Sequence, residues 1–171
     1  MSRRTSLLLA TVLILAWSAV ALAQDASQPA PCSSSQYRQF DFWLGEWKVT
    51  DKDGKLLGHN SITSILGGCG LEENWKSANG KSTGTSYNIF DGGRKVWHQT
   101  WIDNSGLLLT IEGGIRDGSM VLDGRTRGPK GELRQRITWT PLPDGRVRQF
   151  WETAPPDGEF KAAFEGFYAR R

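Results

Sequence analysis

The chain has 171 residues, with 21 Lys and Arg against 18 Asp and Glu and a net charge of +3 at pH 7. A net charge this small does not favour nucleic-acid binding, which is typical of strongly basic domains. Acidic residues interrupt a basic cluster that has no aromatic residues within it, so we interpret it as a solvated pair of strands: Arg125, Arg127, Lys130, Arg134 and Arg136. We therefore predict no nucleic-acid partner.

The first 23 residues have the pattern of a secretory signal peptide. Arg3 and Arg4 give a positive start, an apolar run covers 7–22, and Ala21-Leu22-Ala23 forms a small-x-small cleavage site. A transmembrane anchor is the competing interpretation, because the run is about long enough to cross a bilayer. The polar, proline-containing segment that follows favours cleavage. We predict an exported chain, periplasmic or secreted, with no stable membrane anchor after signal cleavage.

About 148 residues remain after residue 23, enough for one domain with a good core. Without Arg3 and Arg4, 19 basic residues stand against 18 acidic ones, which is a net charge of +1. Residues 24–32 are polar and carry prolines, which predicts a flexible leader. Residues 33–171 are assigned to a single domain, and the sequence leaves its oligomeric state open.

Both cysteines, Cys32 and Cys69, lie in the part predicted to be exported, where a disulfide can form. Two cysteines 37 residues apart do not constrain pairing, so a disulfide and two buried free thiols both remain open. The two histidines, His59 and His98, have no close Cys or His spacing. We therefore predict no metal site.

A short helix is predicted before the strands, because Ser33, Ser34 and Ser35 can cap a turn or two through 36–40. From Gly45 onward the dominant period is two, and turn residues separate the segments at regular spacing. No long helical pattern separates two strands, which rules out parallel βαβ units and favours an antiparallel up-and-down meander. Ten strands are predicted, at 46–50, 55–66, 71–77, 83–90, 95–103, 107–115, 119–126, 132–140, 146–153 and 160–170.

Closing such a meander into a β-barrel removes its exposed edges, whereas a flat sandwich leaves them. The faces favour the barrel, because most strands carry a mixed aromatic and polar face opposite a polar or aliphatic one. A face of this kind is typical of a small-molecule pocket. The alternative is that the tryptophans fill the lumen, since each large aromatic side chain buries about 150–250 Å². The residues predicted to bind a small apolar or aromatic ligand are Glu73, Trp75, Asn88, Trp97, Gln99, Trp101, Trp139, Gln149 and Trp151.

At the two ends of the predicted barrel, Gly45-x-Trp47 begins the first strand, and Arg170 or Arg171 ends the last. These residues resemble the calycin pattern of lipocalins and their relatives. In that pattern the Trp closes one end of the barrel and the Arg packs across it, a contact of about 1 kcal/mol. The resemblance implies a calycin-like or lipocalin-like barrel closed by Gly45, Trp47 and Arg170.

A closer resemblance covers nearly all of the chain after residue 23. Its motifs are Phe40-Asp41-x-x-Leu44-Gly45-x-Trp47, Gly68-Cys69-Gly70-Leu71-x-Glu73, Gly84-x-Ser86-x-Asn88-x-Phe90-Asp91, Trp97-x-Gln99-x-Trp101-x-Asp103 and Arg148-Gln149-x-Trp151-Glu152. These motifs look like an often exported bacterial family that is known only as a domain of unknown function, so the resemblance implies a fold and no activity.

Haem-binding nitrobindins are similar in general shape, but there a late-strand His ligates the iron. Here no His follows His98, so haem would need His98 or His59, and we predict no cofactor.

The common catalytic motifs are absent from the sequence, and no catalytic residue is assigned. His98 is predicted to point away from the lumen, which separates it from Ser86 and Glu73. Burial of Glu73 would raise its pKa unless Arg136 or another cation compensates, and a structural ion pair is the favoured interpretation. Three functions remain: non-catalytic ligand binding, a hydrolase or isomerase that uses Glu73, and a solid-core envelope or partner-binding protein.

Overall fold

A computed structural model describes residues 29–129 and 131–171 of the chain. The predicted signal peptide and residues 24–28 of the predicted leader lie outside the described residues. Residues 31–171 form one compact unit. Within the described ranges, no helix combines the length and the apolar character that crossing a membrane requires.

Ten β-strands make up this unit, and each predicted strand is present with its ends shifted by at most two residues. The strands are β1 (Gly45–Thr50), β2 (Leu56–Ile65), β3 (Gly70–Ser77), β4 (Thr83–Asp91), β5 (Val96–Asp103), β6 (Leu108–Arg116), β7 (Ser119–Gly128), β8 (Gly131–Pro141), β9 (Val147–Ala154) and β10 (Lys161–Arg170).

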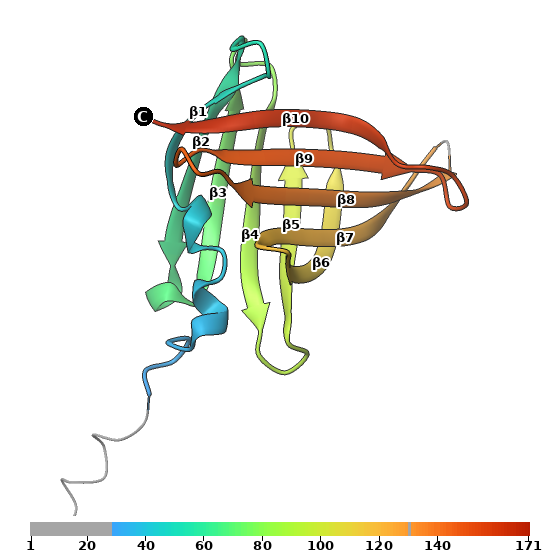
Figure 1. The fold of residues 1–171 in the computed structure, drawn as a ribbon. Coiled ribbons are helices and arrows are strands. Elements are labelled where there is room, and N and C mark those ends of the chain that lie inside the picture. The colour runs from blue at the N-terminus through green and yellow to red at the C-terminus, as the bar shows by residue number, and fades with distance from the viewer. Residues whose placement is uncertain (1–28, 130) are drawn as a thin grey trace, which may run out of the picture. The chain divides into compact units, whose positions relative to one another are not determined.

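Every strand pairs antiparallel with its neighbours along the chain, and β1 pairs with β10 to close the barrel. In the ribbon, β8, β9 and β10 run steeply across β3, β4 and β5, so the sheet wraps around an enclosed core (Figure 1). The prediction of an all-β, ten-stranded, antiparallel up-and-down barrel is confirmed. The flat sandwich is excluded, because β1 and β10 pair with each other and leave no edge strand.

The tight turns between strands explain why the meander could be predicted from sequence. A glycine with positive φ lies in each of several connections, where other residues would be strained. Among the glycines with positive φ in the connections between the predicted strands are Gly54, Gly80, Gly106, Gly118 and Gly145. The sharp corner between β2 and β3 is a 3-10 turn, η3 (Leu66–Gly68), in which Gly67 and Gly68 both have positive φ.

The segment before β1 differs from the predicted capped helix. It forms two 3-10 turns, η1 (Ser35–Arg38) and η2 (Asp41–Trp43). Ser34 is the N-cap of η1, but its side chain makes no capping hydrogen bond, so the expected capping is wrong. The segment is held by other contacts: Cys32 forms a disulfide with Cys69 at the start of β3, and Tyr37 packs edge-on against Phe90 at 5.3 Å.

One end of the barrel, which we call the closed end, is filled by five aromatic side chains. Phe40 stacks on Trp43 at 4.9 Å between ring centroids and meets Trp97 and Trp139 edge-on. The Nε1 of Trp47 donates a hydrogen bond to the Trp43 carbonyl at 2.8 Å. All five rings, those of Phe40, Trp43, Trp47, Trp97 and Trp139, are at most 1% exposed.

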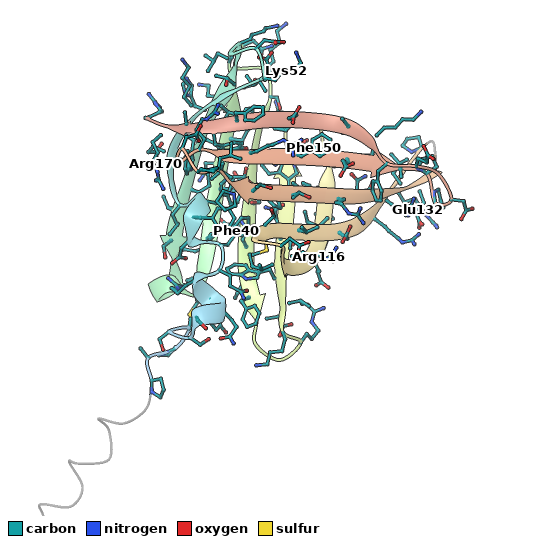
Figure 2. All side chains as sticks on the ribbon, in the orientation of Figure 1. Phe40, Lys52, Arg116, Glu132, Phe150 and Arg170 are labelled. Carbon is teal, nitrogen blue, oxygen red and sulfur yellow. A yellow bond between two sulfur atoms is a disulfide. The ribbon has the colours of Figure 1, made fainter. Side chains whose placement is uncertain are left out.

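Arg170 covers Trp47 at the closed end. Its guanidinium carbon lies 4.3 Å from the Trp47 ring centroid, and Nη1 donates a hydrogen bond to the Leu44 carbonyl at 2.7 Å. Gly45 has a φ of +134°, which strains other residues, and a Cβ there would also push the guanidinium aside. Figure 2 shows Arg170 at the end of β10 and Phe40 beside the N-terminal turns.

Candidate functional site

The other half of the lumen contains a cavity of about 290 Å³. Its rim includes Ser77 at the end of β3, Ser82 before β4 and Asp103 at the end of β5, which are the strand ends opposite the closed end. Ser82 is exposed, so the cavity reaches the surface beside the β3–β4 turn. The full lining consists of Glu73, Trp75, Ser77, Ser82, Gln99, Trp101, Asp103, Leu109, Ile137, Gln149, Trp151, Phe164 and Tyr168.

Aromatic rings form the walls of this cavity, and glycines make room for two of them on the neighbouring strands. The Trp75 ring of β3 lies against Gly58 of β2, and the Trp101 ring of β5 lies against Gly84 of β4. A Cβ at either glycine would collide with the ring. The two glycines therefore let the rings lie close to the backbone of the neighbouring strands, and both rings border the cavity.

Glu73 lies at the boundary between the cavity and the buried interior. Its side chain is only 4% exposed, and it accepts a hydrogen bond on each carboxylate oxygen. Asn60 Nδ2 donates to Oε1 at 2.7 Å, and Ser86 Oγ donates to Oε2 at 2.7 Å. Asn60 on β2 and Ser86 on β4 flank β3, so the two neighbouring strands hold this carboxyl group in place.

Further hydrogen bonds extend from these residues across the lumen. Gln99 Nε2 donates to Asn88 Oδ1 at 2.7 Å and to Ser86 Oγ at 3.2 Å. On the other side, Asn60 Nδ2 donates to the Tyr168 hydroxyl at 3.3 Å, and that hydroxyl donates to Gln149 Oε1. Together these side chains form what we call the polar layer: Asn60, Glu73, Ser86, Asn88, Gln99, Gln149 and Tyr168. Each is at most 9% exposed.

The polar layer contains a carboxyl group without a counter-ion. Among the described residues no cation forms an ion pair with Glu73, and Arg136 pairs instead with Asp123 at 2.7 Å. The interpretation of Glu73 as a structural ion-pair partner is therefore wrong, because Arg136 points to the opposite face of its strand from Gln135 and Ile137. Burial raises the pKa of Glu73 to about 7, and the hydrogen bonds from Asn60 and Ser86 offset only part of this.

The partners of Glu73 suit either protonation state. As a carboxylate it accepts from Asn60 and Ser86. The Asn60 Oδ1 is buried and has no partner within the described residues. Turning the Asn60 amide over would present Oδ1 to a protonated Glu73. Tyr168 stays neutral beside it, because burial and the nearby Glu73 charge raise its pKa well above the usual value.

A second carboxylate, Asp103, lies at the rim of the cavity. Burial alone would raise the pKa of Asp103, but hydrogen bonds from Ser105, Trp101 and Leu107 outweigh this and lower it. The Trp101 Nε1 lies 3.4 Å from Asp103 Oδ2, and the Trp151 Nε1 donates to Gln135 Oε1 at 2.8 Å. Both indole N–H groups are thus bonded to protein atoms, which fixes the orientation of these two rings.

Six of the nine residues predicted to bind a ligand line the cavity: Glu73, Trp75, Gln99, Trp101, Gln149 and Trp151. The other three do not. Trp97 and Trp139 point into the lumen, but at the depth of the closed end, where they pack against Phe40. Asn88 lies behind Gln99 in the polar layer and orients its amide.

The prediction also omitted several residues of the site. Asn60 completes the polar layer, and Tyr168 and Phe164 line the cavity from β10. Alternation from Arg170 along β10 indicates both Phe164 and Tyr168, so a signal was present. Asn60 has no such signal, because neither of its inward neighbours on β2, Gly58 and Ile62, is aromatic or amide-bearing. The other omitted lining residues are Ser77, Ser82, Asp103, Leu109 and Ile137.

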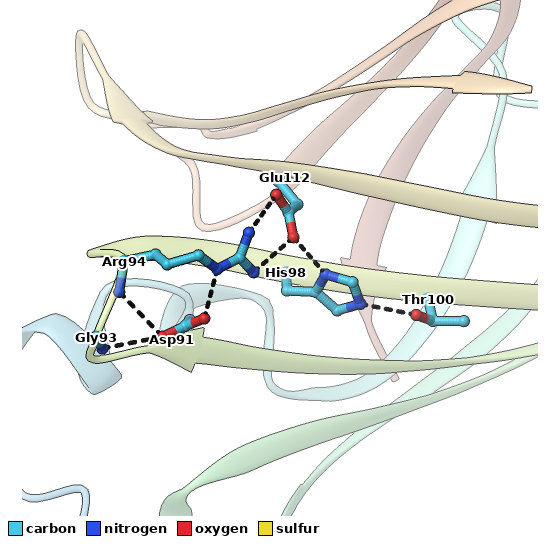
Figure 3. A network of polar contacts seen from close by, with 6 residues as sticks. All are labelled: Asp91, Gly93, Arg94, His98, Thr100 and Glu112. Carbon is cyan, nitrogen blue, oxygen red and sulfur yellow. Dashed lines mark hydrogen bonds and ion pairs between the residues drawn. The ribbon is translucent and has the colours of Figure 1, made fainter.

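The histidines lie on the outer face of the barrel. His98 is hydrogen-bonded through Nδ1 to Glu112 at 2.9 Å and through Nε2 to Thr100 at 2.8 Å (Figure 3). Hydrogen bonds from Arg94 and His98 lower the pKa of Glu112 to about 2. His59 also alternates outward, next to the lumen-facing Asn60. Neither histidine points toward Ser86 or Glu73, so neither can act as a base for the Ser86 hydroxyl.

Side chains that could ligate a metal are scattered over the part of the chain that the structure describes. Among them, no three His, Cys, Asp or Glu side chains are grouped so that they could hold a metal ion. The outward direction of His59 and His98 leaves no imidazole among the residues that line the cavity.

The comparisons with known proteins assign no family to the chain. No protein-family model matches it, and no curated protein is found to be similar. The chemical character of the cavity and of the polar layer is therefore the basis on which a function can be argued.

Proposed function

We propose that the protein binds a small, partly apolar or aromatic molecule in the cavity and does not change it chemically. The observation that carries this proposal is an open space walled by Trp75, Trp101 and Trp151 above a floor of hydrogen-bonded polar side chains. Apolar walls with a few fixed polar groups are the usual composition of a small-molecule site. The ligand is small, because the volume lies near the lower limit of such sites.

The size of the cavity favours this function over a solid-core structural protein. A volume of about 290 Å³ is equivalent to roughly ten molecules of liquid water at about 30 Å³ each. The closed end shows that this chain can fill its lumen with aromatic rings, because Trp43, Trp47 and Trp139 are completely buried there. The open half is not filled in the same way.

An enzyme that uses Glu73 is the second candidate, and one observation favours it. A carboxyl group with a pKa of about 7 beside a cavity is suited to general acid or base chemistry near neutral pH. The residues that line the cavity include no histidine to act with Glu73, and Ser86, which donates to Glu73, lies buried behind the lining. A Glu73→Gln variant that retains every turnover of the wild-type protein would eliminate this candidate.

We also propose that the chain is exported and that its barrel is of the calycin or lipocalin type. The Cys32–Cys69 disulfide supports export, because disulfides persist in oxidising compartments. The contact of Arg170 with Trp47 supports the calycin type. Membership of the often exported bacterial family of unknown function remains a prediction, because no family model matches the chain.

Titration of tryptophan fluorescence with phenethyl alcohol tests the binding proposal. We expect the neutral aromatic probe to change the emission of the wild-type protein in a saturable way. In Gly84→Ala the new Cβ collides with the Trp101 ring and displaces it toward the lumen, so binding should weaken about tenfold or more. Gly114→Ala is the matched control, because a Cβ there meets no atom within 4 Å.

Two outcomes would count against ligand binding. The first is a wild-type emission that stays unchanged with phenethyl alcohol. The second is equal affinity in Gly84→Ala and Gly114→Ala, which would place the probe outside the cavity. Circular dichroism of both variants would establish that each is folded before the affinities are compared.

A further inference from the structure

The charges around the cavity are all of one sign. Glu73 lies at its floor and Asp103 at its rim, and both carry acidic side chains. None of the lining residues is Lys, Arg or His. A site with this composition repels organic anions and leaves the charge of Glu73 without a partner from the described part of the chain.

From this arrangement we infer that the ligand is an organic cation, a molecule with a protonated amine on a small aromatic or aliphatic body, whose ammonium group contacts Glu73. The inference rests on the proposed binding function and specifies its ligand class. The body of the ligand occupies the space between the tryptophans, and the amine points toward the polar layer.

The polar layer contains hydrogen-bond acceptors that no donor of the described residues occupies and that an ammonium group can use. A carboxylate offers about four lone-pair positions, and Asn60 and Ser86 occupy only two on Glu73. Gln99 directs its Nε2 to Ser86 and Asn88, and within the described residues its Oε1 accepts no hydrogen bond. Three N–H donors of a primary ammonium therefore match the acceptors that Glu73 and Gln99 present at the cavity floor.

The walls suit a cation for a separate reason. Trp is the best aromatic partner for a cation placed over its face. Trp101 and Trp151 have their N–H groups bonded to Asp103 and Gln135, so their rings are held in place around the cavity. The attraction is strongest where water is excluded, as it is near a carboxylate that is only 4% exposed.

A cationic ligand also accounts for the cost of burying Glu73. Burial raises the pKa of this carboxyl group to about 7, because its charge has no counter-ion. An ammonium group bound next to it would supply that counter-ion and hold Glu73 in its ionised form. Binding should therefore be linked to the ionisation of Glu73.

The other titratable groups around Glu73 do not change charge in the same pH range. Tyr168 on β10 has a pKa well above its usual value and stays neutral. Asp103 on β5 has a lowered pKa and stays ionised. The flanking strands β2 and β4 present Asn60 and Ser86, which do not titrate. A pH dependence near neutrality in the cavity would therefore report Glu73.

The test is calorimetric titration of the wild-type protein with three probes of similar size: phenethylamine, phenethyl alcohol and phenylacetate. Charge-assisted hydrogen bonds contribute more than neutral ones, so the amine should bind about tenfold or more tightly than the alcohol. Phenylacetate should bind most weakly. As the pH falls below about 7, amine affinity should drop by up to tenfold for each pH unit, while alcohol affinity stays constant.

Glu73→Gln provides the matched variant, since the amide keeps the shape and loses the charge. The variant should lose the preference for the amine over the alcohol, and amine binding should lose its pH dependence. If Glu73→Gln fails to fold, the pH dependence of amine affinity in the wild-type protein is by itself the test of the cation inference. Equal affinity for amine and alcohol, or an amine affinity independent of pH, would overturn the cation inference and leave the binding function standing. No binding of any probe would overturn both.

Discussion

The two halves of the lumen use the same residue type for opposite purposes. At the closed end Trp43, Trp47 and Trp139 have no exposed surface. Trp43 stacks on Phe40, Trp139 meets Phe40 edge-on, and Trp47 meets Tyr168 edge-on. In the open half Trp75 and Trp101 are partly exposed and lie against glycines, with the cavity in front of them. The difference shows that tryptophans fill this lumen where aromatic rings pack against one another, and border a cavity where glycines on the next strand leave room for the ring.

The polar layer separates these two halves. It provides hydrogen bonds where the aromatic packing of the closed end stops, and its Glu73 and Gln99 form part of the cavity floor. Stability should therefore depend mainly on the closed end, and binding on the open half. Four changes test this division.

The largest effect is expected from removing a closed-end ring. Trp47→Ala should lower the free energy of unfolding by about 3–5 kcal/mol, because the ring is fully buried and also bonds to the Trp43 carbonyl. Trp151→Ala, in the open half, should cost about 1–2 kcal/mol, since that ring already borders empty space. Urea unfolding measures both losses of stability. Equal losses would contradict the division between a stabilising closed end and a binding open half.

The disulfide should have the next largest effect. Cys32→Ser with Cys69→Ser opens a link between residues 37 apart and should cost about 3–4 kcal/mol, mainly by freeing the unfolded chain. Reduction of the wild-type protein should shift the urea midpoint to the same extent. If reductant also shifts the urea midpoint of the doubly substituted protein, the loss of stability on reduction has an origin other than the disulfide.

The pH dependence of stability should reveal the buried carboxyl group. The folded pKa of Glu73 is raised from 4.5 to about 7, so the native state binds the proton more tightly than the unfolded state. The contribution of Glu73 to the free energy of unfolding is fully present below a pH of about 4.5. It falls by roughly 3 kcal/mol in all as the pH rises to about 7.

Glu73→Gln removes this titration and serves as the control. The difference in unfolding free energy between wild type and variant, measured by urea at a series of pH values, cancels the groups common to both. As the pH is lowered from about 7 to 4.5, the free energy of unfolding of the wild-type protein should rise relative to that of the variant. A flat difference would mean that Glu73 has an ordinary pKa.

The smallest effect belongs to the closure by Arg170. Arg170→Met should lower stability by about 1 kcal/mol, because it removes the stacking on Trp47 and the bond to the Leu44 carbonyl and keeps an apolar stem. Arg171→Met is the matched control, since this exposed neighbour contributes its backbone N–H to the Glu46 carbonyl. Equal losses of stability from Arg170→Met and Arg171→Met would contradict a role for the Arg170 side chain in closing this end of the barrel.

Alternation along the strands predicted which side chains face the lumen but not how deep they lie. Trp97 and Trp101 share one face of β5 and look equivalent in sequence. At roughly 3.3 Å per residue they lie about 13 Å apart along the strand, which is enough to put one in the closed end and the other at the cavity. Depth depends on the register of all ten strands around the barrel, and no local pattern encodes that register.

The fold was more predictable than the site because its determinants are local. Turn glycines and period-two segments fixed the strands from Gly45 to Arg170 almost to the residue. The environment of Glu73 depends on Asn60, which lies on the paired strand β2, and on Tyr168 of β10, which is distant in sequence and comes near only when β1 pairs with β10. The missing counter-ion of Glu73 follows from Arg136 pointing outward to Asp123.

The most direct test of the division between the two halves is an NMR titration of the indole N–H signals with phenethyl alcohol. Each described tryptophan gives a separate signal that substitution can assign. We expect the signals of Trp75, Trp101 and Trp151 to shift, and those of Trp43, Trp47, Trp97 and Trp139 to stay in place. Shifts at the closed end equal to those around the cavity, or no shift at all, would contradict a lumen divided into a packed core and a binding site.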